Sequence, residues 1–193
     1  MNYPLTRGKV DAITLPQSNQ LFVVVGGQVA HARIMDMAAR LALSGQLLIL
    51  DGGNRANPYP LARELRRLTN DPVKALNRIQ IARAFTCHQV VTLLEQTLEN
   101  RGTRRPVLIL DLLSTFYDES IPFVESQRLL ERAIRSIRLI NQGAPVVVSS
   151  RPPTVDLPQR RVFVTRLCAI ASQVWEEAPV PVLVSQQMVL PGL

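Results

Sequence analysis

A glycine turn follows the first apolar run of the chain and precedes a segment with helical spacing. Gly26 and Gly27 come directly after the run 21–25, and a helix that starts here would offer free N–H groups to a phosphate. The phosphate-loop pattern of nucleotide-binding proteins also needs a lysine followed by a hydroxyl residue. Counted from Gly26, these two positions hold Ala32 and Arg33. A plain strand-to-helix turn is therefore favoured, and Arg33 is the alternative source of charge.

Two carboxylates end later apolar runs. Asp111 follows the run 107–110, where nucleotide-binding proteins place an aspartate that binds magnesium. Asp51 follows another apolar run and begins the glycine turn DGGN. In dinucleotide-binding folds such a carboxylate binds a ribose hydroxyl, but the turn after the first run lacks the later glycines of that motif. We expect a turn in which Gly52 and Gly53 allow a positive φ.

Arginine dominates the positive charge. The chain has 22 Lys and Arg against 15 Asp and Glu, a formal net charge of +7, and Lys9 and Lys74 are its only lysines. A basic surplus is typical of proteins that bind nucleic acid, although solvated arginines without a partner explain it equally well. Two groups of arginines are candidates for DNA contacts, one on a predicted helix and one around a proline-rich loop that follows a predicted strand. They are Arg128, Arg132 and Arg135 on the helix, and Arg151, Arg160 and Arg161 around the loop.

Few residues suit a metal site or a nucleophile. The histidines are His31 and His88, the cysteines are Cys87 and Cys168, and neighbours such as Cys87 and His88 point in different directions on a helix. We expect structural roles for Cys87 and His88. Two cysteines make neither a disulfide framework nor a four-ligand zinc site, so a reduced, cytoplasmic protein is the simplest interpretation. The N-terminus lacks the apolar core of a signal peptide, and no apolar run approaches the roughly 18 residues of a membrane span.

Apolar runs alternate with helical patterns along the chain. This alternation predicts a single α/β domain over 1–193 with a mainly parallel sheet and helices on both faces. The glycine turns and Asp111 then lie at the carboxyl ends of the strands, where such sheets bind ligands. The predicted strands are 21–25, 47–50, 79–81, 107–110 and 145–148, with late strands over 180–184 and 188–190 that suggest a hairpin, and the predicted helices are 29–43, 60–68, 87–99, 124–140 and 159–171, with a short one capped by Asp71.

Several ordered stretches resemble the core ATPase domain of the RecA/RadA recombinase family. The segment 77–89 (NRIQIARAFTCHQ) is similar to the strand and A-R-A…Q segment of archaeal and eukaryotic recombinases, and 106–117 (PVLILDLLSTFY) to their Walker B strand and the stretch after it. The segments 48–65 and 127–150 resemble neighbouring strands and helices of that domain. The resemblance covers about 21–150 and implies a RecA-like P-loop NTPase fold. On that division, 1–20 is an N-terminal extension and 151–193 holds a loop and the C-terminal strands.

Most of the family's catalytic residues have no counterpart in this chain. The resemblance places the phosphate-loop lysine and hydroxyl on Ala32 and Arg33, and the glutamate that positions the attacking water on Gly53. Of the catalytic set only Asp111, the magnesium ligand, is kept. Because phosphoryl transfer depends on these groups acting together, ordinary ATP hydrolysis is not expected. The remainder is a vestigial nucleotide site, to which Gly26, Gly27 and Arg55 also belong.

We therefore expect a catalytically degenerate RecA-like protein, an accessory factor in DNA recombination or repair that binds DNA, single-stranded DNA above all, or a recombinase. No cofactor is expected. The first alternative is an active NTPase that uses ATP and magnesium at a phosphate site rebuilt around Arg33 or Arg55. The second is a regulatory module that binds a protein through the edge of its sheet. Membrane association is not expected, and a homo-oligomer is compatible with this interpretation.

Overall fold

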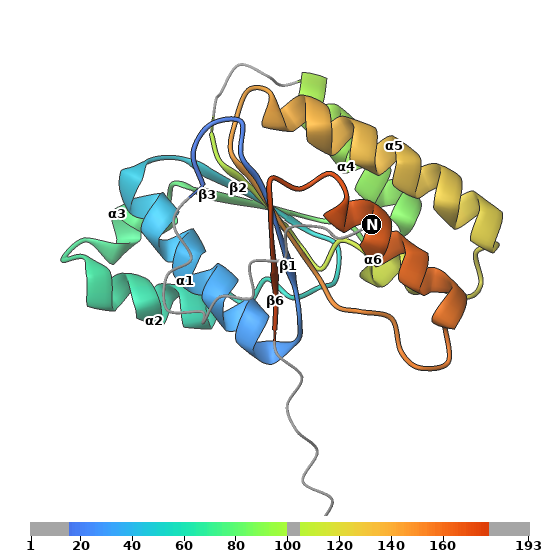
Figure 1. Ribbon diagram of the computed structural model, residues 1–193. Helices are drawn as coiled ribbons and strands as arrows, with labels where there is room; N and C mark the ends of the chain where they lie inside the picture. The colour runs from blue at the N-terminus through green and yellow to red at the C-terminus, as the bar shows by residue number, and fades with distance from the viewer. Residues whose placement is uncertain (1–15, 100–104, 178–193) are drawn as a thin grey trace, which may run out of the picture.

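The computed structural model describes residues 16–99 and 105–177, in which strands and helices alternate (Figure 1). The strands are β1 (Leu21–Val25), β2 (Leu47–Asp51), β3 (Ile79–Arg83), β4 (Val107–Leu110), β5 (Val146–Ser150) and β6 (Gln173–Glu176). The helices are α1 (Gln28–Ser44), α2 (Pro58–Leu68), α3 (Pro72–Leu76), α4 (Cys87–Glu99), α5 (Phe123–Asn141) and α6 (Arg161–Cys168). Two short 3₁₀ helices, η2 (Ser114–Tyr117) and η3 (Pro158–Arg160), lie before α5 and α6.

The described strands form one six-stranded sheet in the order β3-β2-β4-β5-β1-β6. Each neighbouring pair is parallel, so the predicted α/β fold with a parallel sheet is confirmed. The order differs from the 3-2-1-4-5-6 order of dinucleotide-binding domains, because β5 and β4 separate β1 from β2. The fold is therefore not the arrangement in which a carboxylate after the second strand meets a ribose held by the turn after the first.

The direction of the connections explains which face each helix covers. From β1 through β2 to β3 the chain advances toward one edge of the sheet, and from β3 through β4 and β5 to β6 it returns. Crossovers between parallel strands are nearly always right-handed, so a reversal of direction moves the helices to the opposite face. Helices α1, α2 and α3 accordingly cover one face, and α4, α5 and α6 cover the other (Figure 1).

Each strand supplies both layers of the core. In β2, Leu47 and Ile49 pack under α1, α2 and α3, whereas Leu48 and Leu50 pack under α4 and α5. All four side chains are buried, because both faces of a parallel sheet are covered. This two-sided burial is the reason that the central strands are continuous apolar runs in the sequence.

The predicted elements over the described residues are largely confirmed. Helix α2 begins at Pro58, two positions before the predicted start, and the Asn57 side chain accepts the Tyr59 N–H at 3.0 Å. Asp71 caps α3 as predicted. Strand β6 was not predicted, and the predicted helix over 159–171 is shorter, because it divides into η3 and α6. The predicted strands over 180–184 and 188–190, and most of the extension over 1–20, lie outside the described residues.

Candidate functional site

The topology places two switch points at the carboxyl ends of the strands, where parallel-sheet folds form ligand crevices. A crevice forms where adjacent parallel strands continue into helices on opposite faces of the sheet. This occurs between β1 and β5, and again between β2 and β4. The first crevice holds the turn Gly26–Gly27 and the residue Arg151, and the second holds the DGGN turn and Asp111. The predicted site residues around these turns are thus brought to one edge of the sheet.

The turn between β1 and α1 is short, and the position for an anion beside it is already filled. Only Gly26 and Gly27 separate the strand from the helix. The Glu177 carboxylate lies on the start of α1, where its Oε2 accepts the N–H of Gly27 at 2.7 Å and that of Ala30 at 3.1 Å. A Cβ on Gly26 would lie 2.5 Å from the Cβ of Glu177, so a glycine is required for this approach. The anion position at the α1 N-terminus is therefore occupied by a carboxylate of the chain itself.

The residues aligned with the lysine and the hydroxyl do not belong to this turn. Ala32 and Arg33 lie within α1 and are exposed, whereas Ile34 and Met35 beyond them are buried in the core. His31, in the first turn of α1, is half-buried and interacts with charged groups at the strand ends. Burial lowers the pKa of His31, Arg55 lowers it further, and Asp111 and Asp51 act in the opposite direction. His31 is thus the histidine of the strand-end site.

Asp51 is occupied by the turn that it begins. Its carboxylate is fully buried, with Oδ1 accepting the N–H of Arg55 at 2.8 Å and Oδ2 accepting that of Ala56 at 2.9 Å. The guanidinium of Arg83 adds an ion pair, with Nε 3.3 Å from Oδ2. These contacts use both carboxylate oxygens, so Asp51 holds the turn in place and is not presented to a ligand.

The expectation of positive φ at Gly52 and Gly53 is wrong. No described glycine has a φ in the left-handed region, and within the turn that conformation belongs to Asn54, with φ 53°. Asparagine adopts this conformation more readily than most residues because its short side chain can bond to the local backbone. Gly53 is needed for another reason: a Cβ there would lie 2.5 Å from the Cβ of Asp111.

Asp111 has an unusual backbone and a saturated side chain. Its φ is 49°, and its N–H donates to Ser149 Oγ at 2.9 Å. Its Oδ1 accepts the N–H of Arg151 at 3.1 Å, and its Oδ2 accepts Nε and Nη2 of the same arginine at 2.8 and 2.7 Å. The expected magnesium ligand is thus bonded to Arg151, and this arrangement does not fit a metal ion. The described residues contain no cluster of three or more His, Cys, Asp or Glu that could hold one.

The loop arginines predicted to contact DNA differ in their surroundings. Arg160 is 3% exposed, and its guanidinium donates to the carbonyls of Phe116 and Ile121 and to Ser126 Oγ. The prediction that Arg160 contacts DNA is therefore wrong, because the side chain is buried against η2 and the start of α5. Arg161 is exposed at the start of α6, and Arg151 is engaged by Asp111.

The arginines of α5 are exposed, and the nearby glutamates have other partners. Arg132 is bound by Glu95 of α4, with Nη2 2.9 and 3.0 Å from its two carboxylate oxygens. Glu131 pairs with Arg166 of α6, and Glu125 lies 3.8 Å from His88 Nε2. Arg128 and Arg135 are in no ion pair within the described residues. The outer surface of α5 is thus lined by charged side chains: Glu125, Arg128, Glu131, Arg132 and Arg135.

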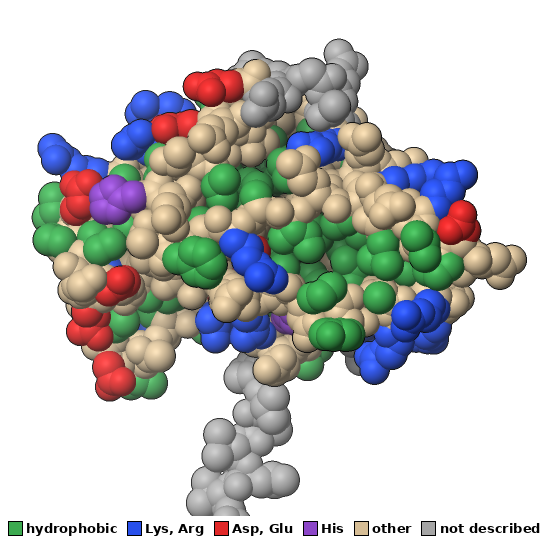
Figure 2. Space-filling model, turned by 180° about the vertical axis from the view of Figure 1, so that it is seen from behind, with side chains coloured by type: hydrophobic (Ala, Val, Ile, Leu, Met, Phe, Trp, Pro, Cys, Tyr) green, Lys and Arg blue, Asp and Glu red, His purple; other side chains and the backbone are tan. Residues whose placement is uncertain are grey.

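The wider surface carries its basic side chains in separate groups. Figure 2 shows Lys and Arg distributed around one face of the molecule, with hydrophobic side chains between them. On α1 and α2, Arg40 pairs with Asp36 and Arg67 with Glu64. Over the part of the chain that the structure describes, the positive charge is therefore spread over both helical layers.

The surroundings of both cysteines are unlike those of a catalytic thiol. Cys87 and Cys168 are buried and free. Burial raises the pKa of Cys87, and burial raises the pKa of Cys168 to about 11. Both thiols are thus protonated at neutral pH, which is unlike the lowered pKa of a catalytic cysteine.

Comparison of the sequence with models of protein families and with curated proteins found no match. Within 16–99 and 105–177, no helix combines the length and the apolar character needed to cross a bilayer.

Proposed function

We propose that this chain is a catalytically inactive RecA-like protein that acts as an accessory factor in DNA recombination or repair and binds single-stranded nucleic acid. The proposed lack of catalytic activity is supported above all by the carboxylate of Glu177, which lies on the N-terminus of α1. In a nucleotide-hydrolysing protein that position receives a phosphate. A carboxylate fixed there repels a triphosphate and already uses the N–H groups that would bind it.

The remaining parts of the strand-end site support the same proposal. Phosphoryl transfer is achieved by positioning and by positive charge at the γ-phosphate, including a magnesium ion. Here Asp111 is bonded to Arg151, and Asp51 closes its own turn. The ion pair between Asp111 and Arg151 stabilises the fold, and its charges are not available to a reacting phosphate. ATP turnover would require Glu177 to leave α1 and Arg151 to leave Asp111.

Nucleic-acid binding is supported by the exposed arginines of α5. Each phosphate contact adds affinity by releasing counterions, which needs positive charge that is not neutralised within the protein. Arg128 and Arg135 meet this condition among the described residues, because neither is in an ion pair and Glu131 beside them is bound by Arg166. Two positions seven apart on a helix lie about 10 Å from each other along its axis. The pair can therefore contact separate phosphates of one strand.

The test is fluorescence anisotropy of a labelled single-stranded oligonucleotide at several salt concentrations. Arg128→Ala combined with Arg135→Ala should weaken binding and reduce the slope against salt by up to about 1.4, at about 0.7 for each lost contact. The matched control is Arg40→Ala with Arg67→Ala, because these arginines are exposed but paired with acids on their own helices. Equal loss in both double variants would contradict the assignment to α5. No binding by the parent protein at low salt would favour a protein partner instead.

A further inference from the structure

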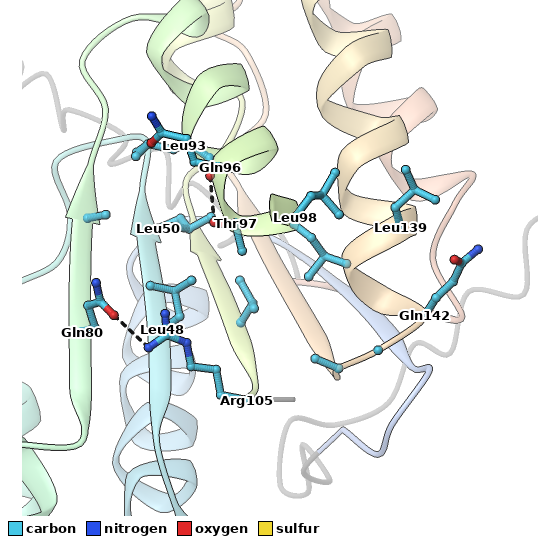
Figure 3. Close-up of a pocket in the computed structure, with 15 residues that line it drawn as sticks. Leu48, Leu50, Gln80, Leu93, Gln96, Thr97, Leu98, Arg105, Leu139 and Gln142 are labelled. Carbon is cyan, nitrogen blue, oxygen red and sulfur yellow. Dashed lines mark hydrogen bonds between the residues drawn. The ribbon is translucent and has the colours of Figure 1, made fainter. Parts of the chain in front are cut away.

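A cavity of about 330 Å³ lies toward the amino ends of the strands, on the face of the sheet that α4 and α5 cover. The strand-end site is at the opposite, carboxyl ends of the strands. Figure 3 shows Leu48 and Leu50 of β2 on one side of it and Leu98 and Leu139, from α4 and α5, on the other. Its volume falls within the range of small-molecule pockets, about 300 to 1,000 Å³. The cavity is partly open to solvent, so a ligand has a route of entry.

Arg105 is the only charged residue among the described residues that line this cavity. It is partly buried, two residues before β4, and its Nη1 donates to Oε1 of Gln80 at 2.8 Å, as the dashed line in Figure 3 marks. No described acid pairs with it. The guanidinium is not needed to cap α5 either, because the N–H groups of Gly143 and Ala144 already donate to the carbonyl of Ile140.

We propose that this cavity binds a small apolar carboxylate, with its hydrocarbon part against the leucines and its carboxylate on Arg105. A carboxylate matches the planar fork of a guanidinium, and the apolar walls strengthen their attraction. To bind there it displaces the neutral Oε1 of Gln80, whose side chain is exposed and is then hydrated. An ammonium would be repelled by Arg105, and an alcohol would offer it only an uncharged acceptor. This site is independent of the nucleic-acid surface proposed above.

The test is isothermal titration calorimetry of the full chain with decanoate, with 1-decanol and decylamine as probes of the same chain length. Decanoate should bind about tenfold or more tightly than 1-decanol, because the carboxylate forms an ion pair with Arg105 and the alcohol offers it only a neutral acceptor. Decylamine should bind more weakly than either. Saturable binding of the alcohol with an affinity equal to that of decanoate would overturn the assignment to a carboxylate, and absence of saturable decanoate binding would overturn the site.

Two variants test whether the ligand binds in this cavity with its carboxylate on Arg105. Arg105→Gln should weaken decanoate binding about tenfold and leave 1-decanol binding unchanged. Arg138→Gln is the matched control, because Arg138 is exposed on α5 and does not line the cavity. Ala82→Leu, which adds volume to the lining from β3, should weaken both probes while the melting temperature stays near that of the parent. Decanoate affinity equal to the parent's in Arg105→Gln, or in a folded Ala82→Leu protein, would contradict the proposal.

Discussion

Gly53 lies against Asp111 so closely that a single methyl group should disturb the strand-end site. In Gly53→Ala the new Cβ would lie 2.5 Å from Cβ, 2.7 Å from Oδ2 and 2.9 Å from Cγ of Asp111. Carbon atoms in favourable contact are about 3.5 to 4.0 Å apart, so the overlap is about 1 Å or more. Asp111 has little room to yield, because Ser149 holds its N–H and Arg151 holds both of its carboxylate oxygens.

We expect Gly53→Ala to lower the free energy of unfolding by about 1–3 kcal/mol, the range for overpacked positions. For a chain of this size that corresponds to a fall of about 2–12 °C in Tm, followed by circular dichroism. The control is Gly52→Ala. The new Cβ would come no nearer than 3.5 Å to the atoms packed around it, and the backbone of Gly52 is not in the left-handed region. Its Tm should stay level or rise, because alanine restricts the unfolded chain.

A double variant separates the overlap from other effects of the alanine. Asp111→Gly removes the carbon that the new methyl group meets and relieves the left-handed backbone at φ 49°. The destabilisation by Gly53→Ala should therefore largely disappear when Asp111→Gly is already present. Steric overlap with Asp111 is refuted if Gly53→Ala and Gly52→Ala melt within about a degree of each other, a shift well below that expected for 1 kcal/mol, or if the loss from Gly53→Ala is the same in the Asp111→Gly background.

The surroundings of three single residues lead to further predictions. Arg160→Met should lower the free energy of unfolding in urea by about 1–3 kcal/mol, because buried carbonyls lose their donor, whereas Arg161→Met should leave it unchanged; equal midpoints would contradict the buried role of Arg160. The pKa of His31 is lowered in the folded state, so the unfolded state binds more protons just below pH 6.5, and the free energy of unfolding is full above that pH and falls as the pH drops through it. His31→Gln should reduce the difference in free energy of unfolding between about pH 7.5 and 5.5, and an unchanged difference would contradict this. Iodoacetamide should label Cys168 at about pH 8 only after urea unfolds the chain, because burial raises its pKa to about 11, and labelling of the folded protein by mass spectrometry would count against it.

Local patterns were sufficient for most of the fold. Both faces of the sheet are covered, so the central strands are continuous apolar runs of residues with branched side chains. This made β1, β2, β4 and β5 recognisable in the sequence. Strand β6 was missed because it lies at an edge and only Val174 is buried, so it has no such run. The order of the strands has no local signal at all.

The site depends on contacts that sequence spacing does not encode. Glu177 reaches Gly27 across 150 positions, so nothing near the glycine turn indicates that the anion position is filled. Arg160 and Arg161 are neighbours of the same type, yet η3 directs one into the core and α6 leaves the other in solvent. The predicted α/β alternation located the carboxyl ends of the strands where these residues gather, but the partner of each charged residue there required the structure.

The most direct test of the proposed function is one binding experiment on the unmodified protein. Anisotropy of a labelled single-stranded oligonucleotide is measured as a function of protein concentration at low and at moderate salt, with and without magnesium and ATP. We predict binding that weakens steeply with salt through phosphate contacts, and that is identical with and without ATP, because Glu177 occupies the anion position of α1. Absence of binding at low salt, or an affinity that changes when magnesium and ATP are added together, would contradict the proposed function.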